Sequence, residues 1–163
     1  EIPLETVIHT AKLAKVLGKK VILNPAPAMA LPDELLGYLH IITPNKTETE
    51  MLTGFKINDI HSTKMAAEKI REKGVANVII TLGSQGAYIY NDDGGRLIPT
   101  PEVKAVDTTA AGDVFNGALA VAISEGEGLD AAVEFANRAA ALSVTKMGAQ
   151  ASAPFRNELI TIQ

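Results

Sequence analysis

The sequence is most informative at first through what it lacks. It contains no cysteine, which excludes disulfides, thiolate metal sites and cysteine nucleophiles. Its three histidines, His9, His40 and His61, stand far apart in the sequence, so a histidine metal cluster is not expected. No apolar run approaches the ~20 residues needed to span a bilayer, and the first residues do not resemble a secretion signal. The sequence therefore predicts a cytoplasmic protein.

The composition is that of a globular domain. Of 163 residues, 47% are hydrophobic and 21% are charged, a balance that allows a core of ordinary size and does not suit a disordered chain. The net charge of −4 argues against nucleic acid or an anionic membrane as the main partner. A local phosphate site stays possible, because a loop or helix terminus can bind an anion without net positive charge.

Strand and helix patterns alternate along the chain. Helical patterns cover 4–17, 32–39, 45–52, 60–73, 113–124, 129–144 and 155–160, and strand patterns cover 21–23, 41–43, 77–81, 87–90, 96–98 and 103–106. This order predicts a three-layer α/β fold with a mostly parallel, Rossmann-like sheet. A turn at 92–95 adds a local antiparallel hairpin. With no linker or repeat, residues 1–163 are expected to form one domain.

In an open parallel sheet, ligands bind beyond the carboxyl ends of the strands. Four loops hold that position here, 24–30, 44–48, 82–86 and 107–113, and all carry polar residues or glycine.

The loop 107–113 has the sharpest pattern. Its small residues Ala110, Ala111 and Gly112 lead into a helix, so free main-chain N–H groups and the positive end of the helix dipole converge on one point. Asp113, on the first turn, would lie beside an anion bound there and could deprotonate a nucleophile that attacks a phosphate. The residues alone equally allow a plain helix start, with Asp113 favoured by the dipole and Asp107 in a turn.

Three other segments have a structural interpretation, which leaves room for a functional one. Asn45 and Glu48 form the pattern of a helix N-cap with its capping-box acid, and such side chains also suit hydrated Mg²⁺. The segment Thr81-Leu82-Gly83-Ser84-Gln85-Gly86 is a glycine turn after a strand, without the lysine and helix of a Walker loop. The segment 143–152 indicates a helix end at Gly148 followed by a loop.

The stretch from Asp107 to Ala120, DTTAAGDVFNGALA, resembles the C-terminal signature of the ribokinase, or phosphofructokinase B, family of carbohydrate kinases. The segment NPAPA at 24–28 is also similar to ribokinases. The resemblance implies that Asp113 is the catalytic base for a sugar hydroxyl and that the main chain of Ala110, Ala111 and Gly112 holds the transferred phosphoryl group.

The same resemblance implies further roles. Asn45 and Glu48 would organise Mg²⁺ and phosphate through water, Gly112 and the 81–86 turn would bind ATP, Asn137 would contact the adenine side, and Glu1 would contact the sugar. Oxygen atoms of six residues would surround a K⁺ activator: Asp107, Thr109, Ser143, Lys146, Gly148 and Ser152. The implied reaction converts ATP and D-ribose to ADP and D-ribose 5-phosphate.

The resemblance covers the whole chain but only the second part of the family's sequence. The sequence starts at Glu1, in what reads as the middle of a longer protein, and the family's sugar-binding and lid segment has no counterpart. Exposed sheet edges and apolar helix faces are therefore expected to favour a homo-oligomer. Two alternatives remain open: a kinase for another sugar or a nucleoside, and a non-catalytic module that binds nucleotide or self-associates. A nicotinamide dehydrogenase is disfavoured, because no G-x-G-x-x-G follows the first strand.

Overall fold

The computed structural model describes residues 2–161. It divides into two compact units, each described by itself. Unit 1 comprises the chain up to Leu82 together with Tyr88–Arg96, and unit 2 comprises Gly83–Ala87 and the chain from Leu97 onward. That residues 1–163 form a single domain, as expected from the sequence, stays a prediction.

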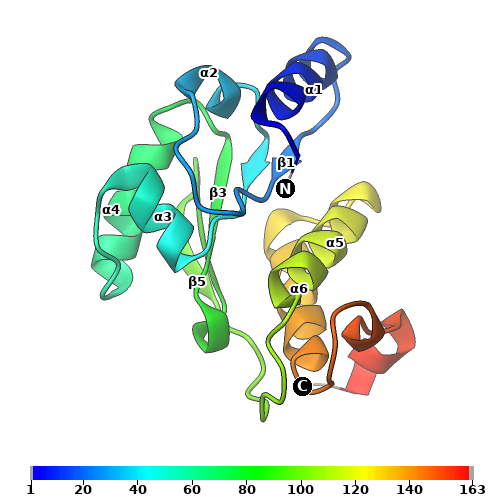
Figure 1. The fold of residues 1–163 in the computed structure, drawn as a ribbon. Helices are drawn as coiled ribbons and strands as arrows, with labels where there is room; N and C mark the ends of the chain where they lie inside the picture. The colour runs from blue at the N-terminus through cyan, green and yellow to red at the C-terminus, as the bar shows by residue number, and fades with distance from the viewer. Residues whose placement is uncertain (1, 162–163) are drawn as a thin grey trace. The chain divides into compact units, whose positions relative to one another are not determined.

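Unit 1 is built around a sheet whose strands follow the order of the chain (Figure 1). The strands are β1 (Ile22–Leu23), β2 (Ile41–Ile42), β3 (Asn77–Thr81), β4 (Ala87–Asn91) and β5 (Gly94–Ile98), and the ends of β4 and β5 fall in unit 2. The first three strands are parallel. β4 and β5 are joined by the two residues Asp92 and Asp93, which is the length of a tight hairpin. The predicted α/β class, with parallel strands first and a hairpin after them, is confirmed.

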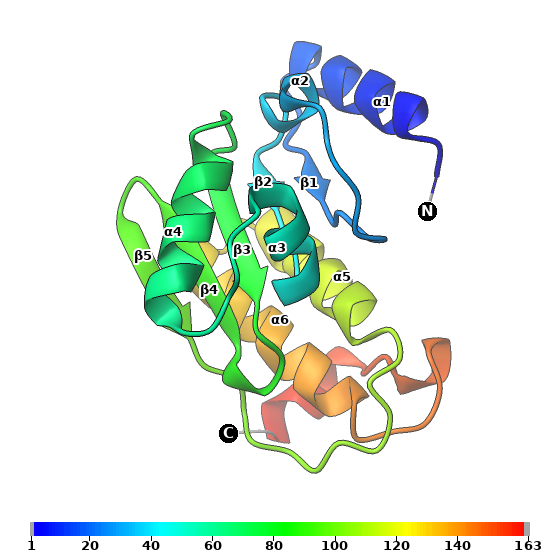
Figure 2. The same ribbon diagram turned by 60° about the vertical axis from the view of Figure 1, so that its left-hand side comes forward.

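Four helices complete unit 1: α1 (Leu4–Val16), α2 (Asp33–Leu36), α3 (Lys46–Thr53) and α4 (Ile60–Arg71). α3 and α4 pack on the face of β3, as Figure 2 shows. Three consecutive residues of β3, Val78, Ile79 and Ile80, are fully buried, which is typical of an inner strand covered on both faces.

The register of the parallel strands brings their carboxyl ends to one edge. Ile22 lies opposite Ile41, and Ile41 lies opposite Asn77. The loops that follow β1, β2 and β3 consequently leave the sheet on the same side, which is where the sequence predicted ligand-binding loops.

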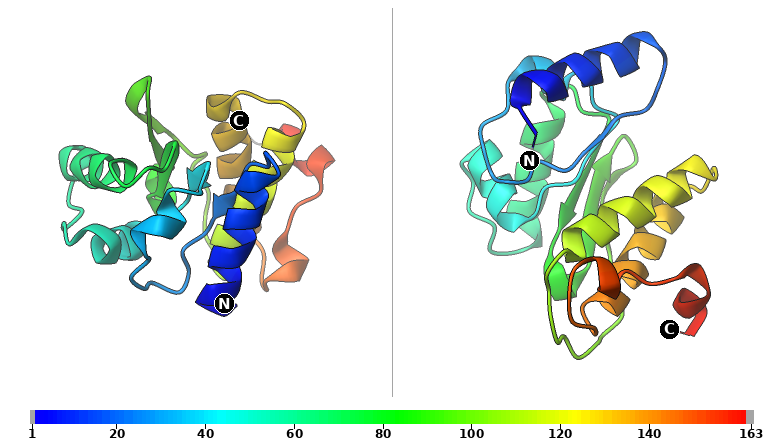
Figure 3. Two further views of the ribbon diagram at one scale, coloured as in Figure 1. Left: turned by 90° about the horizontal axis from the view of Figure 1, so that it is seen from above. Right: turned by 45° about the vertical axis from the view of Figure 1, so that its right-hand side comes forward.

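Unit 2 contains the two longest helices, α5 (Ala111–Ser124) and α6 (Leu129–Ser143), which lie side by side (Figure 3). Leu119, Ala132 and Ala136 are buried on these helices, and the alanines let the two backbones approach closely. Three short 3₁₀ helices, η1 (Gly83–Gln85), η2 (Gln150–Ser152) and η3 (Arg156–Thr161), belong to the same unit.

The strand predicted at 103–106 is wrong, because this segment is irregular. Its end is held by the C-cap residue of α6, Val144, whose carbonyl accepts from the N–H groups of Val106 and Asp107. The helix predicted at 32–39 shortens to Asp33–Leu36, and the terminal helix is 3₁₀. Among the residues described, no helix has both the length and the apolar character needed to cross a membrane.

Candidate active site

The start of α5 presents main-chain donors that have no acceptor among the described residues. Ala110 caps the helix in the left-handed conformation, with φ 60° and ψ 12°, and supplies no side-chain cap. The N–H groups of Ala111 and Val114 donate to Thr108 and Ala110. Within residues 2–161, no acceptor faces the N–H groups of Gly112 and Asp113. The geometry is that of an anion site at a helix N-terminus.

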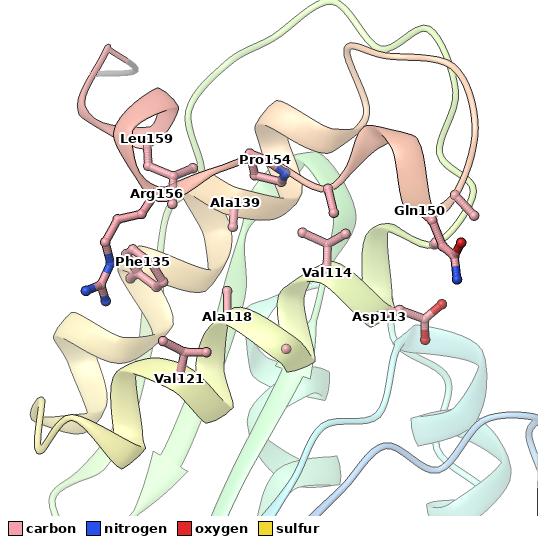
Figure 4. A pocket seen from close by; sticks show the side chains of 14 residues that line it. Asp113, Val114, Ala118, Val121, Phe135, Ala139, Gln150, Pro154, Arg156 and Leu159 are labelled. Atoms are coloured by element: carbon pink, nitrogen blue, oxygen red, sulfur yellow. The ribbon is translucent and has the colours of Figure 1, made fainter.

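The Asp113 side chain is exposed beside these donors. It lies at one end of a groove in unit 2, next to Gln150, and Arg156 lies at the other end (Figure 4). The groove has a volume of about 510 Å³. Apolar side chains of α5, α6 and the C-terminal segment form its walls, among them Val114, Ala118, Val121, Phe135, Ala139, Pro154 and Leu159. A carboxylate that is open to solvent and adjacent to free N–H groups can accept a proton from a bound hydroxyl.

The loop that leads into α5 is fastened by the carboxylate of Asp107. One oxygen accepts from the N–H of Thr109 at 2.9 Å, and the other accepts from the N–H of Gly148 at 2.9 Å. The hydrogen bonds from Thr109 and Gly148 lower the pKa of Asp107 to about 2. A carboxylate that stays ionised therefore ties 107–110 to the loop after α6.

Several of the residues predicted to bind K⁺ lie at this contact. Asp107 bonds to Thr109 and Gly148, and the N–H of Lys146 donates to the carbonyl of Ser143. Within the described chain, no hydrogen bond reaches the carbonyl oxygens of Thr109, Lys146 and Gly148. Carbonyl and hydroxyl oxygens are a donor set that fits a hard monovalent cation, so the residues fit the predicted ion. The Ser152 hydroxyl is fully buried and donates to Ala149 at 2.8 Å.

Asn45 and Glu48 form a capping box at the start of α3, as predicted. Glu48 donates its N–H to the Asn45 side chain at 2.9 Å, and its two carboxylate oxygens accept from the N–H and Nδ2 of Asn45 at 2.8 and 2.9 Å. Glu48 is only 6% exposed. Each oxygen keeps a lone pair beyond these bonds, so the pair can accept hydrogen bonds from the water molecules of hydrated Mg²⁺.

The structure brings Asn45 and Thr81 together. They form a parallel bridge, and the N–H of Thr81 donates to the carbonyl of Pro44 at 3.0 Å. Two predicted site segments of unit 1 thus meet where β2 and β3 end.

Leu82 of the predicted nucleotide turn also belongs to unit 1, whereas Gly83–Gly86 lie in unit 2. η1 covers Gly83–Gln85, and the N–H of Gly86 closes the turn on the carbonyl of Gly83 at 3.0 Å. Ser84 and Gln85 are exposed, whereas Gly86 is buried.

Asn137, predicted to contact the adenine side, is a buried residue of α6. It is only 4% exposed, so it is not a solvated helix residue, and its Nδ2 donates to the carbonyls of Ile98 and Pro99. Its predicted contact with adenine stays a prediction. No local pattern predicts this contact, because 98–99 and 137 are brought together only by the fold. The same holds for the groove residues Gln150 and Arg156. Glu1, predicted to contact the sugar, lies outside the described residues.

The chain is similar to known proteins over nearly its whole length. Residues 1–156 match the model of the pfkB family of carbohydrate kinases. The chain is 48% identical over 160 residues to a ribokinase of Haemophilus influenzae, covering 98% of this chain and 52% of that protein. It is 38% identical over 157 residues to a deoxyribokinase of Salmonella typhi, covering 94% of this chain and 51% of that protein.

Solved structures show the same fold. A ribokinase of Arabidopsis thaliana in complex with ribose and ATP has a TM-score of 0.92 at 35% identity, and the match covers 98% of this chain and 52% of that one. A ribokinase of Thermotoga maritima has a TM-score of 0.87 at 47% identity, with coverage of 98% and 52%. The chain spans about half the length of the relatives that it matches. By the match over 1–156, it belongs to the pfkB family of carbohydrate kinases.

Proposed function

We propose that this chain carries the nucleotide-binding and catalytic part of a kinase that transfers the γ-phosphoryl group of ATP to the 5-hydroxyl of D-ribose. One observation carries the proposal: the unused N–H groups of Gly112 and Asp113 stand beside an exposed carboxylate at the start of α5. The ribokinase relatives, one of them solved with ribose and ATP, support the choice of substrates.

Each residue of this turn has a distinct task. Asp113 takes the proton of the sugar hydroxyl as its oxygen forms a bond to the γ-phosphorus, and the bond from that phosphorus to the bridging oxygen breaks to release ADP. The N–H groups at the start of α5 stabilise the charge that develops on the phosphoryl oxygens. Losing one such donor typically costs about 10²–10³ in kcat.

Two cations would complete the site. Mg²⁺ bound with ATP would neutralise phosphate charge, and Asn45 with Glu48 would hold its water molecules. A K⁺ ion among the oxygens around Asp107 would fix the loop before α5. A cytoplasmic location stays a prediction of the sequence.

A coupled ADP-release assay with MgATP and ribose, with and without K⁺, tests the proposal. We expect ribose-dependent turnover that K⁺ stimulates. Asp113→Asn should abolish turnover while MgATP binding, measured by calorimetric titration, stays within about twofold, because the amide keeps the shape of the side chain but cannot take a proton.

Two results would contradict the proposal. Near-normal turnover of the Asp113→Asn chain would refute the base assignment. A wild-type chain that neither binds MgATP nor releases ADP would refute the nucleotide site. Binding without turnover would favour the non-catalytic module instead.

A second candidate substrate is deoxyribose, because one relative is a deoxyribokinase at 38% identity. The same assay with deoxyribose or a nucleoside in place of ribose compares the candidates by kcat/KM.

We also propose that the chain self-associates. α1 exposes apolar side chains near its C-terminal end, with Val16 77%, Leu17 62% and Leu13 49% exposed. Apolar side chains grouped in this way commonly mark an interaction surface.

A further inference from the structure

Asn137 holds three consecutive residues of another segment. Its Nδ2 donates to the carbonyl of Ile98 at 2.9 Å and to the carbonyl of Pro99 at 3.1 Å. Its own main-chain carbonyl accepts from the Thr100 hydroxyl at 3.3 Å. A side-chain amide has two N–H hydrogens, and both are used here. A ligand therefore finds no free donor on this side chain.

The peptide that Asn137 holds also packs against Gly86. A Cβ atom added to Gly86 would lie 2.1 Å from the carbonyl oxygen of Ile98 and 2.9 Å from the Cα and carbonyl carbon of Pro99. Gly86 also has a φ of +96°, a conformation that glycine alone adopts readily. The backbone of the glycine turn is thus in direct contact with the Ile98–Pro99 peptide, with no space between them for any side chain.

These contacts connect Asn137 to the glycine turn within unit 2. Asn137 is bonded to the carbonyl of Ile98, the same carbonyl lies against Gly86, and Gly86 closes the turn by its bond to Gly83. α6 is thereby linked to the turn through the main chain of Ile98 and Pro99.

We propose that Asn137 is a positioning residue for the glycine turn Gly83–Gly86, and that it acts through the main chain of Ile98 and Pro99 and not by donating to a nucleotide. The consequence for ATP affinity rests on the proposed function. The positioning itself does not depend on it.

Asn137→Asp is the sharpest variant, because it keeps the shape of the side chain and removes both donors. The carbonyls of Ile98 and Pro99 would then face a carboxylate, and the 98–99 peptide would be released from α6. Asn157→Asp is the matched control: Asn157 belongs to η3 of the same unit, is exposed, and undergoes the same change of charge.

Amide hydrogen exchange of the whole chain, without nucleotide, tests the positioning. Asn137→Asp should speed exchange at Gly86 by at least about tenfold while the Phe115 and Leu119 amides of α5 keep the wild-type rate. Asn157→Asp should leave both regions unchanged. Unchanged exchange at Gly86, or an equal increase at Gly86 and throughout α5, would overturn the proposal, because the second result is general loosening.

MgATP titration then tests the link to the nucleotide. Asn137→Asp and Gly86→Ala should each weaken binding by about tenfold or more, and the double variant should be no weaker than the poorer single one, since both disturb the same contact. Weaker binding without faster exchange at Gly86 would indicate direct contact with the nucleotide and overturn the proposal. If the wild-type chain binds no MgATP, the proposed function fails, and the exchange experiment still decides the positioning.

Discussion

Asp107 is the residue whose charge state is most clearly set by its neighbours. Its pKa is lowered to about 2 by the hydrogen bonds from Thr109 and Gly148, whereas an aspartate in an unfolded chain titrates near ~3.9. Because the folded pKa is the lower one, the ionised carboxylate contributes stability above pH ~4, and this contribution is lost as the pH falls toward about 2.

Replacing Asp107 with Asn should therefore make the free energy of unfolding depend less on pH under acidic conditions. The variant should be less stable than wild type at pH 7, and the difference should shrink at pH 3, as measured by urea unfolding at both values. Glu102→Gln, an exposed change in the same unit, should keep the wild-type profile. A constant difference across this range would show that the Asp107 charge does not act through these bonds.

At the scale of single residues, the sequence points to candidate site residues more readily than to the contacts between residues. Asp113 could be singled out because small residues and a helix start surround it in the chain. The left-handed conformation of Ala110 could not be predicted, because alanine has no preference for it. The Asn137 contact could not either, since its partners lie far away in the sequence and are main-chain carbonyls that any residue provides.

At the scale of elements, α3 shows that a capping pattern is a strong local signal. Asn45 and Glu48 were expected to begin the helix, and they form a complete capping box there. Gly54 then ends it in the left-handed conformation with φ 76°, as glycine commonly does after a helix.

Asn45→Ala should destabilise the chain by about 1 kcal/mol, because it removes the acceptor for the Glu48 N–H. In a protein of this size such a loss lowers Tm by roughly 2–4 °C, which thermal unfolding followed by circular dichroism detects. Lys46→Ala, at the next and also exposed position, is the control and should change Tm far less. If both variants melt alike, the cap contributes nothing measurable.

Two of the predicted strands show where a strand prediction succeeds and where it fails. β3 was expected at 77–81 and is found there, because an unbroken apolar run of strand length has few alternatives. The segment 103–106 has an apolar run that Lys104 interrupts, it follows Pro99 and Pro101, and its end bonds to the C-cap carbonyl of α6 instead of a strand. Strand formation needs a neighbour that local sequence does not reveal.

At the scale of the whole molecule, the two units carry different parts of the proposed chemistry. Unit 1 contains the capping box and Thr81, and unit 2 contains the glycine turn, the start of α5 and the loops around Asp107. Alternation of helices and strands predicted the α/β class but not this division, because both units draw on residues that are distant in the sequence.

Self-association is the property of the whole molecule that is open to the most direct test. Leu13, Val16 and Leu17 are spaced so that they share one face of α1 and its end, and all three are exposed. Burying apolar surface stabilises a contact by about 25 cal/mol per Å², but a stable interface needs about 1,200–2,000 Å² in total. These three side chains would thus be the centre of a larger contact.

We therefore expect the wild-type chain to show a concentration-dependent increase in mass by light scattering. Leu13→Lys combined with Val16→Lys should shift it to monomer, because each charge would have to be desolvated at the interface. Met51→Lys combined with Met65→Lys, which adds the same two charges at exposed residues of α3 and α4, should leave the association unchanged. A wild-type monomer throughout the concentration range would refute self-association, and equal effects of all these substitutions would mean that net charge, and not the face of α1, controls it.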